Sequence, residues 1–351
     1  MNRRLNLAII GLDNWYHAFP FAELLMRRKD VALKAVSDED ELKREWIRNR
    51  YHIPVYAEHE RILADPAIDG VIITARTSQH LELIEAAVAE GKHVLCDKPL
   101  EVNVERAERV VKIVNSASTV FCMSFPRRAR PLFLEAKRLI ATRVLGELCC
   151  IIEIGRYRLP CKAPGVIDPG WYAEKTHSGG GGFIDHAVHQ IDMLRWWLED
   201  EVASVCCMTG NQAVKNIEVE DYGVAILRFD KGVLATIESS WVSHEATKDV
   251  IEVQGTEGAL RIDVESRTLE VYSSKLSCKM FYTFKPVIFE TPDFRLALDG
   301  FDGILNSFID CIVHGGRPLA TVEDGWAATA VTAAAYESAK FKKEISVPRL
   351  R

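Results

Sequence analysis

Residues 5–16 read Leu-Asn-Leu-Ala-Ile-Ile-Gly-Leu-Asp-Asn-Trp-Tyr, a short apolar run that stops at Gly11. A run of this length is typical of a buried parallel strand, and the sequence after Gly11 is typical of a turn into a helix. Similar runs at residues 31–36, 68–74 and 93–96 alternate with helix-like sequence. This alternation predicts a doubly wound parallel sheet over residues 1–124.

Sheets of this Rossmann-like kind bind ligands beyond the carboxyl ends of their strands. Asp38 follows the second strand, where an acid bonds the ribose 2′-hydroxyl of a dinucleotide. Glu39 and Asp40 beside it would repel a 2′-phosphate, so NAD is expected and NADP is less favoured. The residues expected to bind the cofactor are Gly11, Asp13, Asn14, Trp15, Asp38, Thr74, Thr77, His80, Asp97 and Lys98.

The phosphate-binding turn departs from the G-x-G-x-x-G pattern of such folds. Gly11 is present, but Asp13 and Tyr16 stand where the second and third glycines belong. The carboxylate of Asp13 is expected to oppose the pyrophosphate, and its removal is predicted to tighten NAD binding several-fold. The first helix is expected at residues 21–28, with Pro20 in its first turn.

The sequence changes character at residue 125, which predicts a second domain over residues 125–351. Turn signals at residues 230–232 and 255–258 separate runs that are rich in β-branched and aromatic residues. These features predict an α+β domain with a large, mostly antiparallel sheet, one face of which is open. The expected strands are 149–154, 222–229, 233–241, 250–254, 259–262 and 269–272, and the expected helices are 131–143, 301–313 and 326–340.

Four glycines at residues 179–182 precede a predicted helix in the middle of the chain. Asp185, His189 and Asp192 fall on one stripe of this helix, and the glycines could let a ligand approach the backbone. The same glycines could form only a flexible turn, Asp185 could only cap the helix, and His189 could be a satisfied buried group. His186 and His189 with the two acids could also bind a metal, but no cysteine or further acid–histidine pair reinforces this, and we expect no metal.

Composition bounds the possible partners. The net charge of −6, from 44 basic and 50 acidic residues without a long run of one sign, argues against nucleic acid and anionic membrane. No apolar stretch approaches the length of a membrane span. Nine scattered cysteines without a CxxC motif indicate a reducing compartment, so we expect a cytoplasmic protein.

Several of these motifs together resemble one family, the nicotinamide-dependent oxidoreductases of the glucose–fructose oxidoreductase, inositol dehydrogenase and MocA group. The resemblance covers nearly the whole chain. Its most specific parts are Lys98-Pro99 after a strand and Asp185-x-x-x-His189-x-x-Asp192 after the glycines. Further parts lie at residues 69–73, 91–97, 127–128, 255–258 and 318–338.

The resemblance implies a dehydrogenase that transfers hydride between NAD and a sugar, inositol or related polyol or keto compound. Lys98 would orient the reacting hydroxyl, and Asp185 and His189 would hold the substrate and exchange the proton. Arg127 and His186 would complete the substrate site. Arg76-Thr77 departs from the Pro-Asn that the family usually has beside the nicotinamide.

Two rival functions remain open. The protein could use tightly held NAD for a redox-neutral hydrolysis or epimerisation, or it could be a ligand-sensing protein that has lost turnover. The open face of the second sheet also predicts a homodimer or homotetramer.

Overall fold

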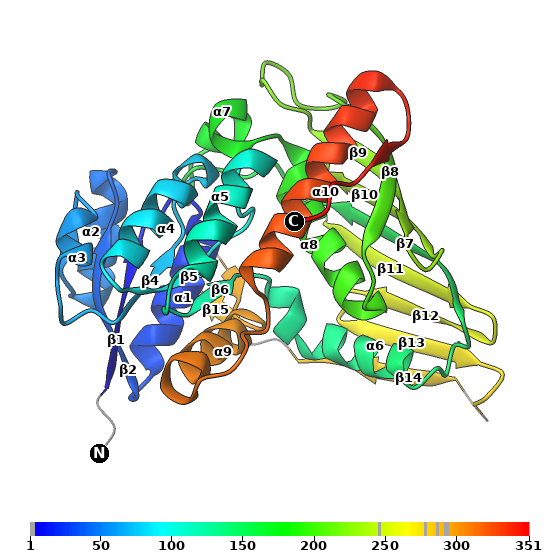
Figure 1. The fold of residues 1–351 in the computed structure, drawn as a ribbon, viewed down its shortest axis with the longest axis horizontal. Coiled ribbons are helices and arrows are strands. Elements are labelled where there is room, and N and C mark those ends of the chain that lie inside the picture. Colours follow the sequence, from blue (N-terminus) through cyan, green and yellow to red (C-terminus); the bar gives the residue numbers. More distant parts are fainter. Residues whose placement is uncertain (1–3, 245–246, 277–278, 286–287, 291–294, 351) are drawn as a thin grey trace.

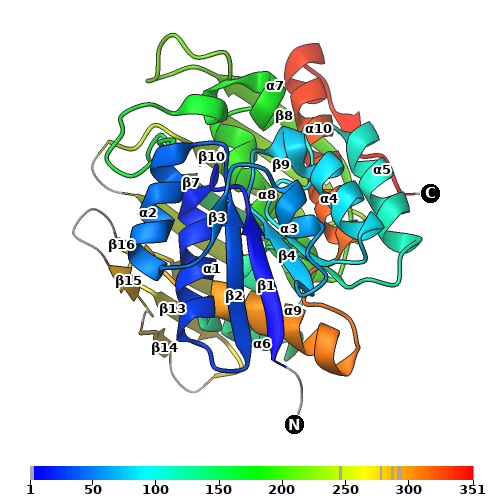
Figure 2. The same cartoon turned by 90° about the vertical axis from the view of Figure 1, so that its left-hand side faces the viewer.

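The computed structural model describes residues 4–244, 247–276, 279–285, 288–290 and 295–350. Its first sheet has six strands, all parallel, in the order β3-β2-β1-β4-β5-β6. The apolar runs of the sequence form its central strands, which are buried between helices, as a doubly wound sheet requires (Figures 1 and 2). The strands are β1 (Leu5–Ile10), β2 (Val31–Ser37), β3 (Val55–Tyr56), β4 (Gly70–Ile73), β5 (His93–Cys96) and β6 (Phe121–Met123). The helices between them are α1 (Trp15–Arg27), α2 (Glu41–Tyr51), α3 (Glu60–Leu63), η1 (Thr77–Gln79), α4 (His80–Ala89) and α5 (Val104–Asn115).

Helix α1 begins six residues before the predicted start. Trp15, Ala18 and Phe19 bury apolar side chains against the sheet, and the amides of His17 and Ala18 bond the carbonyl of Asn14. Pro20 therefore lies inside the helix rather than in its first turn, where it leaves one backbone hydrogen bond unmade. The prediction was wrong here because apolar burial outweighed the cost of an internal proline.

The second sheet has nine strands in the order β14-β13-β12-β11-β7-β10-β9-β8-β17. Its pairs are antiparallel except for β7 with β10, so the sheet is mixed, and the mostly antiparallel prediction is confirmed. The strands are β7 (Leu148–Arg156), β8 (Val202–Gly210), β9 (Tyr222–Phe229), β10 (Leu234–Ser240), β11 (Lys248–Gly255), β12 (Gly258–Asp263), β13 (Thr268–Ser273), β14 (Met280–Thr283) and β17 (Ile345–Ser346). A separate hairpin is formed by β15 (Ile288–Glu290) and β16 (Arg295–Ala297).

Helix α8 (Gly182–Leu198) packs on the inner face of this sheet and carries Asp185 and His189. The glycines before it serve close packing within the chain. A Cβ at Gly180 would lie 2.0 Å from the Tyr336 hydroxyl, and one at Gly181 would lie 2.0 Å from the Glu220 carbonyl. The Glu220 carboxylate accepts hydrogen bonds from the amide of Gly181 and from Tyr336. These contacts place the first turn of α8.

The remaining helices connect the two sheets. They are η2 (Pro126–Ala129), α6 (Pro131–Ala141), η3 (Gly170–Ala173), α7 (Lys175–Ser178), α9 (Phe301–His314) and α10 (Val322–Phe341). Helix α9 packs with α1 in the core of the first domain, and α10 packs against α5, α8 and β8 (Figure 1). One hydrophobic cluster therefore extends from Val71 on β4 of the first sheet to Val271 on β13 of the second. The boundary at residues 124/125 stays a prediction, because the chain returns to the first domain through α9.

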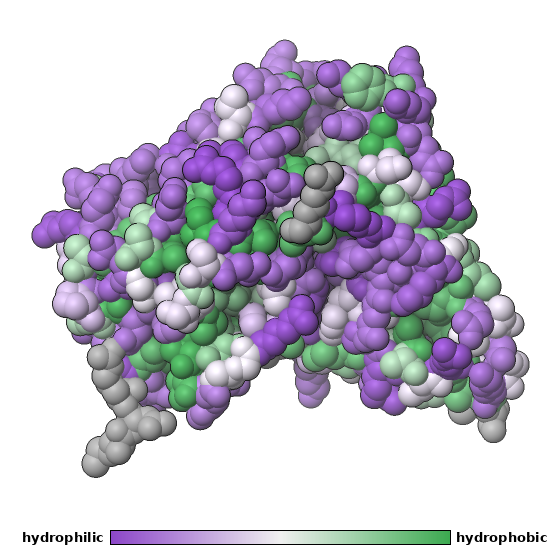
Figure 3. Space-filling view, viewed as in Figure 1, coloured by the Kyte–Doolittle hydropathy of each residue, from purple (hydrophilic) through white to green (hydrophobic). Residues whose placement is uncertain are grey.

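On the face that Figure 3 shows, hydrophilic residues predominate, and apolar residues appear between them over both domains. In the part of the chain that the structure describes, no helix is both long and apolar enough to cross a bilayer.

Candidate active site

An ion pair between the two domains forms the centre of the site. Lys98 follows β5, and its Nζ lies 2.7 Å from Oδ1 of Asp185 on α8 and 2.8 Å from the Asp185 carbonyl oxygen. Trp241 donates its indole N–H to the other carboxylate oxygen of Asp185 at 3.0 Å. Burial raises the pKa of Asp185, but the charges of Lys98 and His186 and these hydrogen bonds outweigh it and hold the pKa below its usual value. Asp185 is therefore an anion at neutral pH.

Two imidazoles adjoin this pair. Burial, followed by the positive charges of Lys98 and Arg127, holds the pKa of His189 well below its usual value. Its Nδ1 is buried and has no hydrogen-bond partner among the described residues, so a neutral His189 can accept a proton. Burial likewise lowers the pKa of His186 to about 3, and its ring stacks on Tyr157 at 3.6 Å.

Arg127 lies behind these imidazoles in a buried ion cluster. Its guanidinium bonds Glu153 on β7 at 2.5 Å and Asp249 on β11 at 2.9 Å. Asp249 also accepts the Tyr157 hydroxyl at 2.6 Å. The structure thus brings Arg127 to His186 through Tyr157, and the contacts of its guanidinium are with the protein. Burial raises the pKa of Glu153 to about 7, so the cluster carries little net charge near neutral pH.

Asp192, which shares the stripe of Asp185 and His189, does not join the site. It forms a bidentate bond with Arg128, and Arg128 also pairs with Asp324 at the start of α10. Seven residues of helix advance about 10 Å along the axis, which separates Asp192 from Asp185 although both face the same way.

Asp97, next to Lys98, organises the edge of the first sheet. It accepts hydrogen bonds from Asn14 Nδ2 at 2.6 Å and the Lys98 amide at 2.8 Å, and its Oδ1 lies 2.6 Å from His17 Nδ1. Burial works to raise the pKa of Asp97, but His17 and Lys98 outweigh it and lower the pKa. The His17 ring lies 6.2 Å from the His189 ring, centroid to centroid. Asp97 is 1 % exposed and holds Asn14, His17 and Lys98 in place, and its contact with the cofactor stays a prediction.

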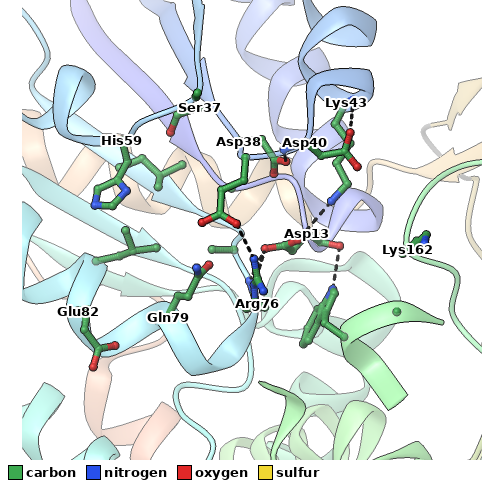
Figure 4. A pocket seen from close by; sticks show the side chains of 18 of the residues that line it. Asp13, Ser37, Asp38, Asp40, Lys43, His59, Arg76, Gln79, Glu82 and Lys162 are labelled. Carbon is green, nitrogen blue, oxygen red and sulfur yellow. Dashed lines mark hydrogen bonds and ion pairs between the residues drawn. The ribbon is translucent and has the colours of Figure 1, made fainter. Parts of the chain in front are cut away.

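A larger cavity of about 630 Å³ opens over the ends of β1, β2 and β4. Gly11, Asp13 and Asp38 line it, as the sequence predicted for a cofactor site (Figure 4). Asp38 accepts hydrogen bonds from the amides of Leu12 and Asp40, and burial raises its pKa, opposed by Lys43. Each carboxylate oxygen of Asp38 keeps a lone pair for a ribose hydroxyl.

Asp13 does not face this cavity as an uncompensated charge. Its Oδ1 lies 3.3 Å from Lys43 Nζ, and its Oδ2 lies 3.1 Å from the Arg76 amide and 3.4 Å from Arg76 Nε (Figure 4). The carboxylate lies between two cations that cancel most of its field. The expected repulsion of pyrophosphate therefore needs correction, because the sequence pattern contained no information on these partners.

The other residues predicted to bind the cofactor differ in whether their side chains are exposed to the cavity. Gly11 has φ +80°, and a Cβ there would lie 2.5 Å from Ala75, so close packing requires the glycine. Thr74 is fully buried and donates its hydroxyl to the Gly11 carbonyl. His80 is 1 % exposed, and both ring nitrogens face backbone carbonyls, including that of Pro99. Thr74 and His80 thus support the turns that form the site, and their contact with the cofactor stays a prediction.

Residues 157–174 cross from the second domain over the cofactor turn. Trp171 donates its indole N–H to the Asp13 carbonyl at 3.2 Å, and Tyr172 donates its hydroxyl to Asn14 Oδ1 at 3.0 Å. The indole of Trp15 is buried and donates its N–H to the Cys161 carbonyl, and the cofactor contact expected of Trp15 stays a prediction. We call residues 157–174 the crossing segment.

The crossing segment narrows the space around the catalytic groups. Asn14, Thr77, Lys98 and Asp185 line a pocket that is closed on one side by Trp171, Tyr172 and Trp241. Its volume is about 10 Å³, room for about one water. The residues present thus fit the adenosine half of a dinucleotide as they stand. On the nicotinamide side, the pocket beside Lys98 and Asp185 has room for about one water in this structure, and Trp171 and Tyr172 are among the residues that line it.

Several residues of the site were not found from the sequence. Lys43, Trp171, Tyr172 and Trp241 line its cavities, and His17 contacts Asp97. The adjacent aromatic pair at residues 171–172, close to the glycine run, was the one local signal. Among the described residues, no group of three or more His, Cys, Asp or Glu side chains is arranged to hold a metal ion.

The parallel sheet, the acid after its second strand and the Lys–Asp–His cluster define a dinucleotide-dependent oxidoreductase. Residues 5–125 match the model of the oxidoreductase family with the NAD-binding Rossmann fold, and residues 133–261 match the GFO/IDH/MocA C-terminal domain. The chain belongs to this GFO/IDH/MocA family of oxidoreductases.

Similar proteins span almost the whole chain. The myo-inositol 2-dehydrogenase of Thermotoga maritima is 25% identical over 330 residues, 93% of this chain and 94% of that protein. The scyllo-inositol 2-dehydrogenase (NAD(+)) of Bacillus subtilis is 28% identical over 332 residues, 92% of this chain and 90% of that protein. The structure of a levoglucosan dehydrogenase with NADH and levoglucosan shares the fold, with a TM-score of 0.83 at 22% identity and coverage of 99% and 100%.

Proposed function

We propose that this protein is an NAD-dependent dehydrogenase that oxidises a secondary hydroxyl of an inositol, a sugar or a related polyol, and reduces the corresponding keto compound in reverse. The observation that carries the proposal is the Lys98–Asp185 pair beside a neutral His189 whose Nδ1 lacks a partner among the described residues. The names of the inositol and levoglucosan dehydrogenases support this substrate class.

Each group has a chemical task in this reaction. His189 takes the hydroxyl proton, and the Lys98 ammonium stabilises the developing alkoxide. Asp185 bonds a hydroxyl of the substrate and balances the charge of Lys98. Nicotinamide, when bound, accepts the hydride. Gly11 and Asp38 would hold the adenosine side, and Asn14 and Thr77 line the nicotinamide side.

The test is a panel of inositols, aldoses and polyols with NAD and purified protein, read by NADH absorbance. Formation of NADH with at least one member of the panel is expected. Binding of NAD without NADH formation on any polyol would contradict the dehydrogenase assignment. Product formation without accumulation of NADH would favour the redox-neutral rival.

The ligand-sensing rival has one observation in its favour, the small pocket beneath Trp171 and Tyr172. A sensor would bind NAD or a polyol in calorimetry and would show no exchange of label between polyol and NADH. Label exchange separates the two, because it detects hydride transfer even when net turnover is slow.

A symmetric dimer through the outer face of the nine-stranded sheet is part of the same proposal. Ile152 on β7 and Ile226 on β9 both pair with Thr236 on β10 and are 44% and 50% exposed, and Met208 on β8 is 75% exposed. Contiguous apolar residues on an open sheet face favour burial against a second copy. A cytoplasmic location is supported by the described cysteines, which are all free thiols.

A further inference from the structure

Four charged side chains form a continuous series along the adenosine cavity. Lys43 pairs with Asp13, Asp13 pairs with Arg76, and Arg76 Nη2 lies 3.0 Å from Glu39 Oε2 (Figure 4). All four line the cavity of about 630 Å³. We call Lys43, Asp13, Arg76 and Glu39 the ion series.

The ion series crosses the ends of three neighbouring strands. Asp13 follows β1, Glu39 follows β2 and Arg76 follows β4, and these strands lie in the order β2-β1-β4. Arg76 therefore reaches across the end of β1 to the acid beyond β2. That acid directly follows Asp38, the residue placed to bond the ribose 2′-hydroxyl. The guanidinium thus lies at the part of the cavity where NADP carries its extra phosphate.

The two ends of Arg76 are held differently. Asp13 accepts a hydrogen bond from the Arg76 amide, and its Oδ2 lies 3.4 Å from Nε. Its side chain is only 17% exposed, so this ion pair holds the guanidinium near the end of β1. Glu39 has a side chain 75% exposed, and a pair this exposed contributes little stability. Loss of the Glu39 charge would free Nη2 without loss of the orientation that Asp13 provides.

We propose that the Glu39–Arg76 pair determines the choice between NAD and NADP. Glu39 engages the Arg76 guanidinium, which would otherwise bind the 2′-phosphate of NADP. The guanidinium fork matches a phosphate, so Arg76 alone would favour NADP. Glu39 engages that donor and repels the phosphate dianion, and NAD is selected. This inference rests on the dinucleotide use proposed above and adds the residues that choose between its two forms.

The experiment measures the dissociation constants of NAD and NADP by calorimetry on the full-length protein and its variants. Glu39→Gln is expected to shift the ratio of the two constants about tenfold toward NADP, because Arg76 can then form a charge-assisted hydrogen bond with the 2′-phosphate. The matched control is Glu41→Gln, the same charge change two residues away. Glu41 pairs with Arg44 and Arg48 and does not line the cavity. The ratio of the NAD and NADP dissociation constants in Glu41→Gln is therefore expected to stay within twofold of the wild-type ratio.

A double variant assigns the effect to Arg76. In Glu39→Gln with Arg76→Gln, the shift toward NADP is expected to disappear. The inference would be overturned if the ratio of the two constants shifted no more in Glu39→Gln than in Glu41→Gln, or if the shift survived in the double variant. In either case, binding of NAD by the wild-type protein would still uphold the proposed function. If the wild-type protein binds neither nucleotide, the proposed function fails and the inference with it.

Discussion

Lys98 Nζ lies 2.7 Å from Asp185 Oδ1, and this contact joins the end of a strand in the first domain to a helix of the second. The groups proposed to be catalytic are therefore brought together only when the two domains are folded against each other. Neither domain alone carries the complete set, since Lys98 comes from one and Asp185 and His189 come from the other.

Lys98→Met and His189→Ala are each expected to lower kcat by two orders of magnitude or more. The first removes the ammonium that stabilises the alkoxide, and the second removes the base that accepts the hydroxyl proton. Steady-state rates with a substrate from the panel measure this. Lys112→Met is the control, since Lys112 is exposed on α5, lines neither cavity of the site and loses the same charge. Rates within a few-fold of wild type in His189→Ala would remove the role of His189.

The partly buried His186 is expected to make the protein less stable in acid. Its pKa falls from 6.5 to about 3 in the folded protein, so the unfolded chain binds the proton first as the pH decreases. The free energy of unfolding should therefore fall as the pH drops below 6.5, by up to about 1.4 kcal/mol per pH unit for this one group. Urea unfolding between pH 7 and pH 4 measures the slope. His186→Gln should reduce it, and His314→Gln, at an exposed position at the end of α9, should leave it unchanged.

Asp13→Asn is expected to change the affinity for NAD by less than about threefold. Lys43 and Arg76 already cancel most of the carboxylate field, and asparagine keeps an acceptor for the Arg76 amide. Calorimetry with NAD gives the constant. A tightening of tenfold would show that Asp13 acts as the isolated charge that the sequence alone predicted.

NAD binding is expected to change the fluorescence of Trp171, because its indole bonds the turn that the pyrophosphate approaches. The change should be absent in Trp171→Phe. It should persist in Trp196→Phe, which removes an indole that packs against Lys137 in the second domain. If NAD changed the fluorescence of Trp171→Phe as much as that of the wild type, Trp171 would not be the reporter, and the crossing segment would keep its position when NAD binds.

Ile226→Lys is expected to convert the proposed dimer to a monomer at micromolar concentration, because it places a charge on the apolar sheet face. Light scattering coupled to size exclusion reads the mass. Leu42→Lys is the matched control, since Leu42 is 76% exposed on α2 of the other domain. A monomeric wild-type protein would contradict the proposed interface.

Strand and helix positions were predictable where burial and turn signals agreed. Strands β5 and β9 have the predicted bounds, because each is an apolar or alternating run that ends at a turn. Strand β8 was missed, since cysteines, methionine and threonine give it no clear alternation. The family and its NAD-binding fold were predicted from a few spaced motifs and are confirmed.

The details of the site depended on contacts between distant residues. Lys98 and Asp185 are 87 positions apart, and each was picked out by the sequence motif in which it lies. Tyr172 and Asn14 are 158 positions apart, and no local pattern relates them. The same limit applies to Asp13, whose charge could be read from the sequence while its partners Lys43 and Arg76 could not.

The hydrophobic cluster that continues from Val71 to Val271, with α10 packed on both α5 and β8, leaves no hinge between the domains in the part of the chain that the structure describes. Rotation of one domain against the other would break this shared core, so we expect nucleotide exchange to depend on the crossing segment. Substitutions at Trp171 or Tyr172 are therefore expected to alter the rate of NADH release more than the rate of hydride transfer, which stopped-flow measurements would separate.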